Sequence, residues 1–534
     1  MTAVTTPATS TDPSPPPAGS RHITAIFAGL LVAMLLSSLD QTIFSTALPT
    51  IVGELNGVNH MLWVTTAYIL AATIMMPVYG KLGDLIGRKH LFIGALVLFM
   101  LGSVVGGLAG SMPGLIAARA IQGLGGGGLL ILAQAIIADV VPVRDRGRYM
   151  GVMGAVFGIS AVAGPLLGGW FTESIGWRWA FWLNIPLGAA AIATAWRFLP
   201  LTRHPDRPPI DIAGFVTMAV SATSLILVTS LGGNTYDWGS PEILGLSLLA
   251  IVAGAAFVWV ESRAVEPLIP LHLFRDRNFN LSTIAGLVIA IAMFGAIGYI
   301  PTYLQMVYGY TATEAGFLTL PMVFGLMLTA LSTGQVVSRT GRYKWMPIAS
   351  GVVMTAGLLL LSTLTASTSI WVVCAYLFVL GAGVGLGMQI LVLIVQNAFP
   401  RREVGTATAA NNFFREIGAS LGSAVVGSLF TARLTSLLTE RLPQDAAAGG
   451  VSENSLTPSL VRNLPDPVRE AIASAYNDAL TPVFLYLVPL TIATILILLF
   501  IREKPLAQTL DAAPEDEAGI EAGLPPLAEV PSRT

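Results

Sequence analysis

The chain consists largely of apolar runs of about 20 residues joined by short polar links. Apolar residues make up 54% of its 534 residues, whereas Asp, Glu, Lys and Arg together make up only 11%. A soluble protein carries roughly 25% charged residues to cover its core, so these runs are expected to face lipid. Inside a bilayer the backbone must satisfy its own hydrogen bonds, which runs of this length do as helices. The sequence therefore predicts an all-α polytopic membrane protein.

Fourteen runs are predicted to span the membrane, and the basic residues orient them. If both termini are cytoplasmic, 21 of the 28 Lys and Arg residues fall on the inner side, five fall on the outer side, and Arg119 and Arg415 lie inside spans. This asymmetry follows the positive-inside rule and is expected of a multi-pass protein in the plasma (inner) membrane. The predicted spans are 23–49, 61–79, 90–110, 113–138, 150–171, 179–199, 210–232, 242–260, 281–306, 314–337, 346–366, 369–398, 404–431 and 480–501.

The two ends of the chain differ in composition from the apolar runs. The N-terminal stretch is rich in Pro, Ser and Thr, and the C-terminal stretch is acidic and Pro-rich, so both are predicted to be disordered tails. The single cysteine, Cys374, excludes a disulfide framework and argues against a cysteine metal site. The predicted organisation is a tail at 1–22, a six-helix bundle at 23–200, an inserted helix pair at 210–261, a second six-helix bundle at 278–501 with an outer loop at 435–479, and a tail at 505–534.

An internal repeat supports two related bundles. The link GKLGDLIGRKH begins at Gly80, and the link GQVVSRTGRYK begins at Gly334; aligned without gaps they share two glycines and an arginine. Each link follows the second helix of a six-helix block. Parallel repeats with a site between them are a transporter design, although one short match alone could arise by chance.

Several ordered motifs resemble the major facilitator superfamily, and in particular its fourteen-helix drug:proton antiporters. The first link resembles that family's gating loop, with Gly80, Asp84, Gly87 and Arg88 in place. LDQTIFSTALP, RAIQGLGGG and WRWAFWLNIPLG resemble its signatures on spans 1, 4 and 6. The resemblance implies two six-helix bundles plus two inserted helices, 14 transmembrane helices in all. GVMGAVFGISAVAGPLLGGW resembles the antiporter signature of span 5, at Gly151, Gly164, Pro165, Gly168 and Gly169.

The loop from Gly80 to Arg88 and the span-5 motif also have physical interpretations. Asp84 can accept hydrogen bonds from helix N-terminal amides or from Arg88, which would tie the two halves together on the cytoplasmic side. The alternative is a loop whose basic residues only fix orientation. The glycines of span 5 allow close helix contact and Pro165 bends the helix. The resemblance implies a flexible seam between the halves, and ordinary small-residue packing is the alternative.

Charged side chains inside spans are the candidates for proton coupling. Asp40 and Arg119 are both predicted to lie in the outer half of the first block, where an ion pair would offset the cost of burying them. If a motion separated the pair, Asp40 would take up a proton, and reunion would release it; a fixed structural salt bridge is the alternative. Asp40 is expected to face the central cavity. Arg415 and Glu416 are adjacent on span 13 and point about 100° apart, and Glu416 is a second proton-site candidate.

No other chemistry is indicated. The glycine-rich stretches lie inside apolar runs, and the phosphate-loop pattern is missing, so nucleotide binding is rejected. The sequence shows no catalytic triad, no metal site and no nucleic-acid patch. The protein is thus predicted not to be an enzyme, to need no cofactor, and to draw its energy from a proton gradient.

Polar and aromatic side chains are available to line a substrate cavity. The candidates are Gln41, Tyr68, Gln122, Tyr299, Tyr303, Gln389, Asn411 and Asn412. In the long outer segment, Asp466 and Pro467 followed by an apolar stripe predict a helix lying at the outer interface.

The predicted function is export of small amphipathic or cationic molecules in exchange for protons by alternating access. The expected partners are a small-molecule substrate, protons and membrane lipid, and the protein is expected to work as a monomer. Two alternatives remain open: a proton-coupled exporter of a specific lipid or secondary metabolite, and a membrane receptor or scaffold without transport.

Overall fold

The computed structural model describes residues 20–55, 60–200, 211–233, 235–441, 458–462 and 464–508. This part of the chain is almost entirely helical, and 13 of its helices are long and apolar enough to cross a membrane. The helices are α1 (Ser20–Glu54), α2 (Met61–Ile86), α3 (Arg88–Gly107), α4 (Met112–Val140), α5 (Val143–Trp170) with a π-helical turn (Phe171–Ile175), α6 (Trp179–Trp182), α7 (Asn184–Phe198), α8 (Ile212–Leu231), α9 (Pro241–Glu261), a 3-10 turn (Leu271–Arg275), α10 (Arg277–Ile297), α11 (Ile300–Tyr308), α12 (Ala312–Leu318), α13 (Leu320–Thr340), α14 (Trp345–Ser362), α15 (Ile370–Ala398), α16 (Val404–Arg441), α18 (Pro458–Arg462) and α19 (Asp466–Leu499).

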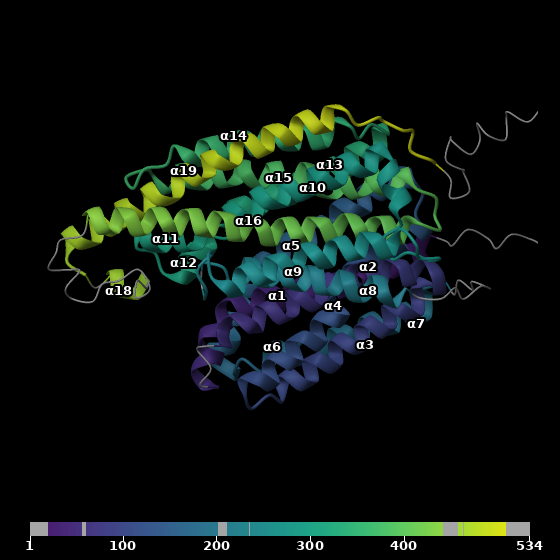
Figure 1. The fold of residues 1–534 in the computed structure, drawn as a ribbon, viewed down its shortest axis with the longest axis horizontal. Helices are drawn as coiled ribbons and strands as arrows, with labels where there is room; N and C mark the ends of the chain where they lie inside the picture. The colour runs from purple at the N-terminus through teal and green to yellow at the C-terminus, as the bar shows by residue number, and fades with distance from the viewer. Residues whose placement is uncertain are drawn as a thin grey trace, which may run out of the picture.

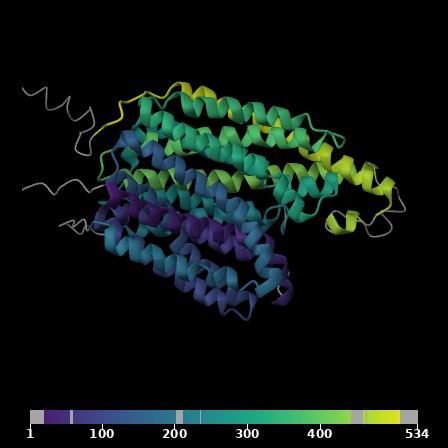
Figure 2. The ribbon, with the colours of Figure 1, turned by 180° about the vertical axis from the view of Figure 1, so that it is seen from behind.

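The helices form two packed groups with a hairpin beside them (Figure 1). In the first group α4 packs against α2 and α3, and α1 packs against α5 and α7; in the second, α15 packs against α13 and α14, and α10 against α16. Two seams join the groups, one between α5 and α13 and one between α2 and α16. The hairpin of α8 and α9 contacts α2 and α16. Figure 2 shows the two groups from behind.

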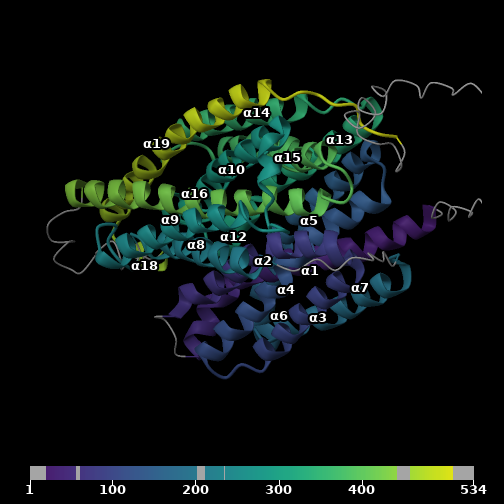
Figure 3. The ribbon, with the colours of Figure 1, turned by 45° about the vertical axis from the view of Figure 1, so that its right-hand side comes forward.

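Both ends of the described chain lie at one end of the molecule's long axis, at the right of Figure 1. We call this the termini end and the opposite one the far end. The link between α2 and α3 lies at the termini end, whereas α16 and α19 extend furthest at the far end (Figure 3).

Short polar residues set several helix starts. The side chains of Asp211, Ser240 and Asp276 each accept a hydrogen bond from a first-turn amide of α8, α9 and α10. Such caps satisfy amides that have no partner within the helix. Thr311 and Glu314 form a reciprocal capping box at the start of α12.

The predicted sixth span at 179–199 is present as α6 and α7 with a one-residue interruption at Leu183, and the other 13 predicted spans match the 13 described helical stretches long enough to cross a membrane. The prediction for the outer segment is wrong. The predicted interface helix at Asp466 is instead the first part of α19, which continues without a break to Leu499. Its apolar stripe, including Ile472 and Tyr476, is buried against the second group rather than lying on a membrane surface. The predicted tails at 1–22 and 505–534 lie mostly outside the described residues.

Candidate functional site

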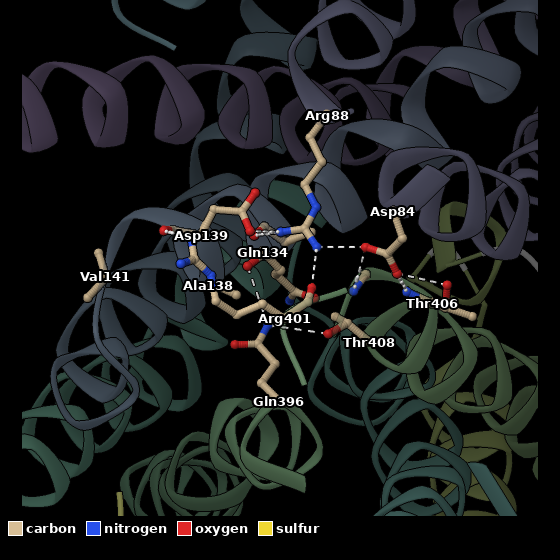
Figure 4. A network of polar contacts seen from close by, with 12 residues as sticks. Asp84, Arg88, Gln134, Ala138, Asp139, Val141, Gln396, Arg401, Thr406 and Thr408 are labelled. Carbon is tan, nitrogen blue, oxygen red and sulfur yellow. Dashed lines mark hydrogen bonds and ion pairs between the residues drawn. The ribbon is translucent and has the colours of Figure 1, made fainter. Parts of the chain in front are cut away.

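At the termini end, Asp84 of α2 ties the two groups together (Figure 4). Its Oδ2 accepts hydrogen bonds from the amide (2.6 Å) and the hydroxyl (2.8 Å) of Thr406, and its Oδ1 from the amide of Gly405 (3.2 Å). Both amides belong to the first turn of α16, where backbone N–H groups lack helical partners and favour an anion. The prediction that Asp84 accepts from helix N-terminal amides across the two halves is confirmed.

Arg88 links Asp84 to α4 and to the link before α16. It donates to Asp84 Oδ1 at 2.6 Å and forms an ion pair with Asp139 of α4, also at 2.6 Å. It also donates to the carbonyl of Arg401, in the link before α16, at 3.4 Å. Gly87 between the two helices has φ of 94°, a conformation that only glycine adopts readily. These contacts and this backbone conformation explain why the loop carries an aspartate (Asp84), a glycine (Gly87) and an arginine (Arg88).

The second copy of the repeat occupies the matching place at the other seam. Ser338, aligned with Asp84, lies near the end of α13 and accepts a hydrogen bond from the amide of Arg148 in α5 at 3.0 Å. Gly341, aligned with Gly87, has φ of 72°. The two seams are therefore related. The α2–α16 seam has the carboxylate of Asp84 where the α5–α13 seam has the neutral hydroxyl of Ser338, so the hydrogen bonds across the α2–α16 seam are the stronger ones.

The glycines of the span-5 motif serve two different contacts. A Cβ on Gly151 would lie 2.5 Å from the carbonyl of Ala330 in α13, so this glycine permits the seam between the groups. Gly164 and Gly168 instead pack against α1 within the first group, beside Thr42 and Ile43. Gly169 has no close neighbour, and the carbonyl of Pro165 accepts from Thr46 of α1 at 3.3 Å. Of these motif residues, Gly151 is thus the one whose closest neighbour belongs to the other half.

A layer of amide side chains continues the closed seam beyond Asp84. Asn412 donates to Gln134 Oε1 of α4 at 3.0 Å. Gln396 of α15 donates to the hydroxyl of Thr408 at 3.3 Å (Figure 4). Along α16 this layer lies between Thr406, the partner of Asp84, and Glu416. The termini end is thus closed over about two helical turns.

Asp40 and Arg119 form the predicted ion pair, and it is fully enclosed. Asp40 is 0% exposed and Arg119 1%. Asp40 Oδ1 also accepts from Gln122 and Asn184, each at 3.0 Å, and the guanidinium of Arg119 lies over the rings of Phe44 and Tyr68. All of these residues belong to the first group. The prediction that Asp40 faces a central cavity is wrong for this conformation, because packed side chains surround it.

A cavity of about 340 Å³ lies between the groups on the far-end side of the amide layer. Gln41, Tyr299 and Glu416, all predicted from the sequence, are among its lining residues. Glu416 supplies its only formal charge, since no Lys, Arg or His is among the described residues that line it. The complete lining is Gln41, Leu62, Thr66, Ile69, Ile226, Thr229, Ser230, Gly232, Gly233, Phe294, Tyr299, Glu416, Ala419, Ser420, Ser423, Ala424, Gly427, Ser428 and Thr431.

The other six cavity candidates lie elsewhere because each packs or bonds within the helical groups or their seam. Tyr68 forms a hydrogen bond with Ser37, and Gln122 donates one to Asp40. The remaining contacts are Tyr303 with Asn477, Gln389 beside Gly154, Asn411 with Thr283, and Asn412 with Gln134.

Arg415 points away from its neighbour Glu416. It is 8% exposed and does not line the cavity, whereas Glu416 does. No ion pair within 4.0 Å joins these two side chains among the described residues, as expected of consecutive helical positions, which differ by about 100°. The cavity wall therefore contains the carboxylate of Glu416 and no cation, although Arg415 lies close enough to interact with it electrostatically.

The sequence interpretation missed several functional positions. Ser103 and Asn184 complete the Asp40 network, and Asp139 is the second partner of Arg88. Asn184 had a visible signal, an amide inside an apolar run. So had the cavity stripe of α16, where polar or small residues recur at helical spacing: Glu416, Ser420, Ser423, Gly427 and Thr431.

Two helical groups closed against each other at one end, with a cavity between them toward the other, define a multi-pass membrane transporter. The sequence model of the Major Facilitator Superfamily matches residues 30–423, and the chain belongs to this superfamily.

Relatives and solved structures agree with this assignment. The chain is 43% identical over 501 residues to an uncharacterized MFS-type transporter of Mycobacterium tuberculosis (strain H37Rv), covering 94% of this chain and 72% of that one. It is 40% identical over 419 residues to the multidrug transporter protein MdtP of Bacillus subtilis, covering 78% and 77%. Multidrug resistance protein 3 of the same species is 36% identical over 480 residues, covering 88% and 93%. The proton:xylose symporter XylE shares the fold, with a TM-score of 0.58 at 14% identity over 92% and 99% of the two chains.

Proposed function

We propose that this transporter exports small amphipathic cations across the plasma membrane in exchange for protons. Relatives named as a multidrug transporter and a multidrug resistance protein support drugs as the class of exported compound. The distribution of basic residues supports an arrangement in which the termini end is cytoplasmic. The described structure is then an outward-facing state, closed on the cytoplasmic side.

The observation that carries this proposal is the charge of the cavity. Glu416 is its only charged lining residue, and hydroxyl, amide, aromatic and aliphatic groups form the rest. A cation is attracted to a lone carboxylate in a partly dehydrated site, whereas an anion is repelled. The volume of the cavity suits a small molecule, since ligand cavities are commonly about 300–1,000 Å³.

The exchange mechanism follows from competition at one carboxylate. A cation and a proton cannot both neutralise Glu416, so protonation from the outer side displaces the substrate. The protonated carrier then opens at the termini end, where the contacts of Asp84 with Gly405 and Thr406 must break. The proton leaves to the cytoplasm and a new cation binds.

The proton concentration gradient supplies the energy. One proton moving inward for one monovalent cation moving outward transfers no net charge, so the pH difference drives the exchange with about 1.4 kcal/mol per pH unit, and the cycle needs no bound cofactor. One chain supplies both walls of the cavity, which supports function as a monomer.

We assign the Asp40–Arg119 pair a different role from that of Glu416. Every described partner of Asp40 lies in the first group. A rocking motion of one group against the other leaves such a pair together, so it serves as a fixed ion pair that holds α1 against α4.

Transport by purified protein in liposomes tests the proposal. With an imposed pH gradient, the parent is expected to move a cation such as tetraphenylphosphonium against the proton flux, and Glu416→Gln to abolish this exchange. Glu242→Gln, which neutralises an exposed glutamate of α9 outside the cavity, is the matched control. Headgroup-dependent lipid flux without cation flux would favour a lipid exporter, and movement of neither would favour a receptor.

A further inference from the structure

The inserted hairpin lies against the crevice between the two groups. On the part of α8 nearer the termini end, Met218 and Ala222 are buried in an apolar cluster with Ile74 of α2 and Phe413 of α16. One side of α8 therefore contacts both halves of the transporter.

The same side of α8 continues into the cavity. Met218, Ala222, Ile226 and Thr229 follow one another at intervals of three or four residues, which places them on one helical stripe. The first two are packed in the apolar cluster, and the last two line the cavity opposite the α16 stripe. Both residues are held in place by neighbouring side chains, because Ile226 is only 3% exposed and Thr229 8% exposed.

The far end of α8 forms part of the cavity rim. Gly232 and Gly233 line the cavity and turn the chain toward α9. Gly233 has φ of 73°, its amide donates to the carbonyl of Tyr236 at 2.8 Å, and a Cβ there would lie 2.7 Å from Trp238 Nε1. The turn is thus fixed by backbone geometry and by the packed indole.

The second helix of the hairpin supports the first without reaching the cavity. Ser221 of α8 donates to the carbonyl of Ala250 in α9 at 2.9 Å. The other side of α9 is exposed, with Ile251 70% and Leu248 63% accessible, as expected of a lipid-facing helix.

From these contacts we infer that the inserted hairpin is the specificity wall of the substrate site. Ile226 and Thr229 contact the apolar flank of a cationic substrate whose charge lies at Glu416, so their size selects among amphipathic cations. This inference rests on the proposed function, because it requires the cavity to hold the substrate.

The test compares two cations of different bulk in proteoliposomes with an imposed pH gradient. Thr229→Trp narrows the cavity and is expected to raise the KM for tetraphenylphosphonium roughly tenfold, the size of discrimination that an apolar pocket provides. The KM for the smaller tetraethylammonium is expected to change by less than about twofold, since little of its surface reaches the wall. Ile226→Ala widens the wall and is expected to lower the preference for the smaller cation.

The controls separate this inference from the proposed function. Ile251→Trp introduces the same side chain on the lipid-facing side of α9 and is expected to leave both KM values unchanged. If Thr229→Trp does not insert, Ile226→Ala and Thr229→Ala still vary the wall. Equal responses of the two cations in every α8 variant that inserts would overturn the inference while Glu416→Gln remained inactive. Transport that survives Glu416→Gln would instead contradict the proposed function.

Discussion

At the scale of single residues, the structure separates two acids that the sequence presents alike. Asp40 and Glu416 are both carboxylates within apolar runs, but Asp40 has an ion-pair partner and two amide donors, whereas Glu416 lines a cavity. The sequence allowed the Asp40–Arg119 pair to be predicted from depth in the membrane. Its enclosure depended on Tyr68, Ser103 and Asn184 from other helices, whose packing no local pattern specifies.

Removing the Asp40 charge should therefore act first on stability. Asp40→Asn leaves the guanidinium of Arg119 buried without its counter-charge, and breaking a buried pair in this way costs about 3–5 kcal/mol. The double variant Asp40→Asn with Arg119→Gln leaves no lone charge and is expected to regain much of the loss. Thermal unfolding in detergent measures both. A stable single variant that has lost only proton coupling would show that Asp40 is the coupling acid instead.

A second residue-scale prediction concerns pH at the far end. Glu54 accepts hydrogen bonds from Arg178 and from the indole of Trp177, each at 2.7 Å, and these bonds hold the pKa of the carboxyl below its usual value of 4.5. Such a group stabilises the fold above its unfolded pKa and loses this effect as pH falls through its lower folded pKa. The Tm difference between the parent and Glu54→Gln should be present at pH 7 and fade below about pH 4. For Glu242→Gln, an exposed control, a similar pH-dependent difference would show that the effect is not local.

At the scale of helices, close backbone contact at the two seams keeps the termini end closed. A Cβ on Gly80 of α2 would lie 2.8 Å from the carbonyl of Gly405 in α16. The motifs predicted that glycines would be needed in these links and in span 5. They did not show that Gly151 borders α13 while Gly164 borders α1, because a helix presents glycines on several sides and only the fold decides which neighbour each one meets.

Enlarging Gly80 should open the termini end. Gly80→Val places two methyl groups into the α2–α16 seam, so the closed state is expected to lose population to the state open at that end. The distance between spin labels at Ile86→Cys and Arg402→Cys, both exposed positions, should lengthen. Gly94→Val, in α3 where no atom lies within 4 Å of the added Cβ, is the control. An unchanged distance in Gly80→Val would contradict the importance of this contact.

At the scale of the whole molecule, the repeat, the basic links and the motifs were enough to predict a two-bundle helical transporter with an inserted pair. They were not enough to locate the cavity. Its lining comes from α1, α2, α8 and the turn after it, α10, α16 and the link before α11, so no single stretch of sequence contains it. The first turns of α19 were predicted to lie at the membrane surface for a similar reason. Their sequence does not show that the second group covers Ile472 and Tyr476.

The central claim is that a proton and a cationic substrate exclude one another at Glu416, and proton release on binding tests it most directly. Tetraphenylphosphonium is added to the purified protein in weakly buffered detergent solution, and the pH change is followed as a function of starting pH. Competition at one carboxylate predicts release of up to about one proton per bound cation at pH values where the free carboxyl is protonated, declining to none where it is already ionised, and none at any pH from Glu416→Gln. Equal proton release from parent and variant, or cation binding that does not depend on pH, would contradict the account.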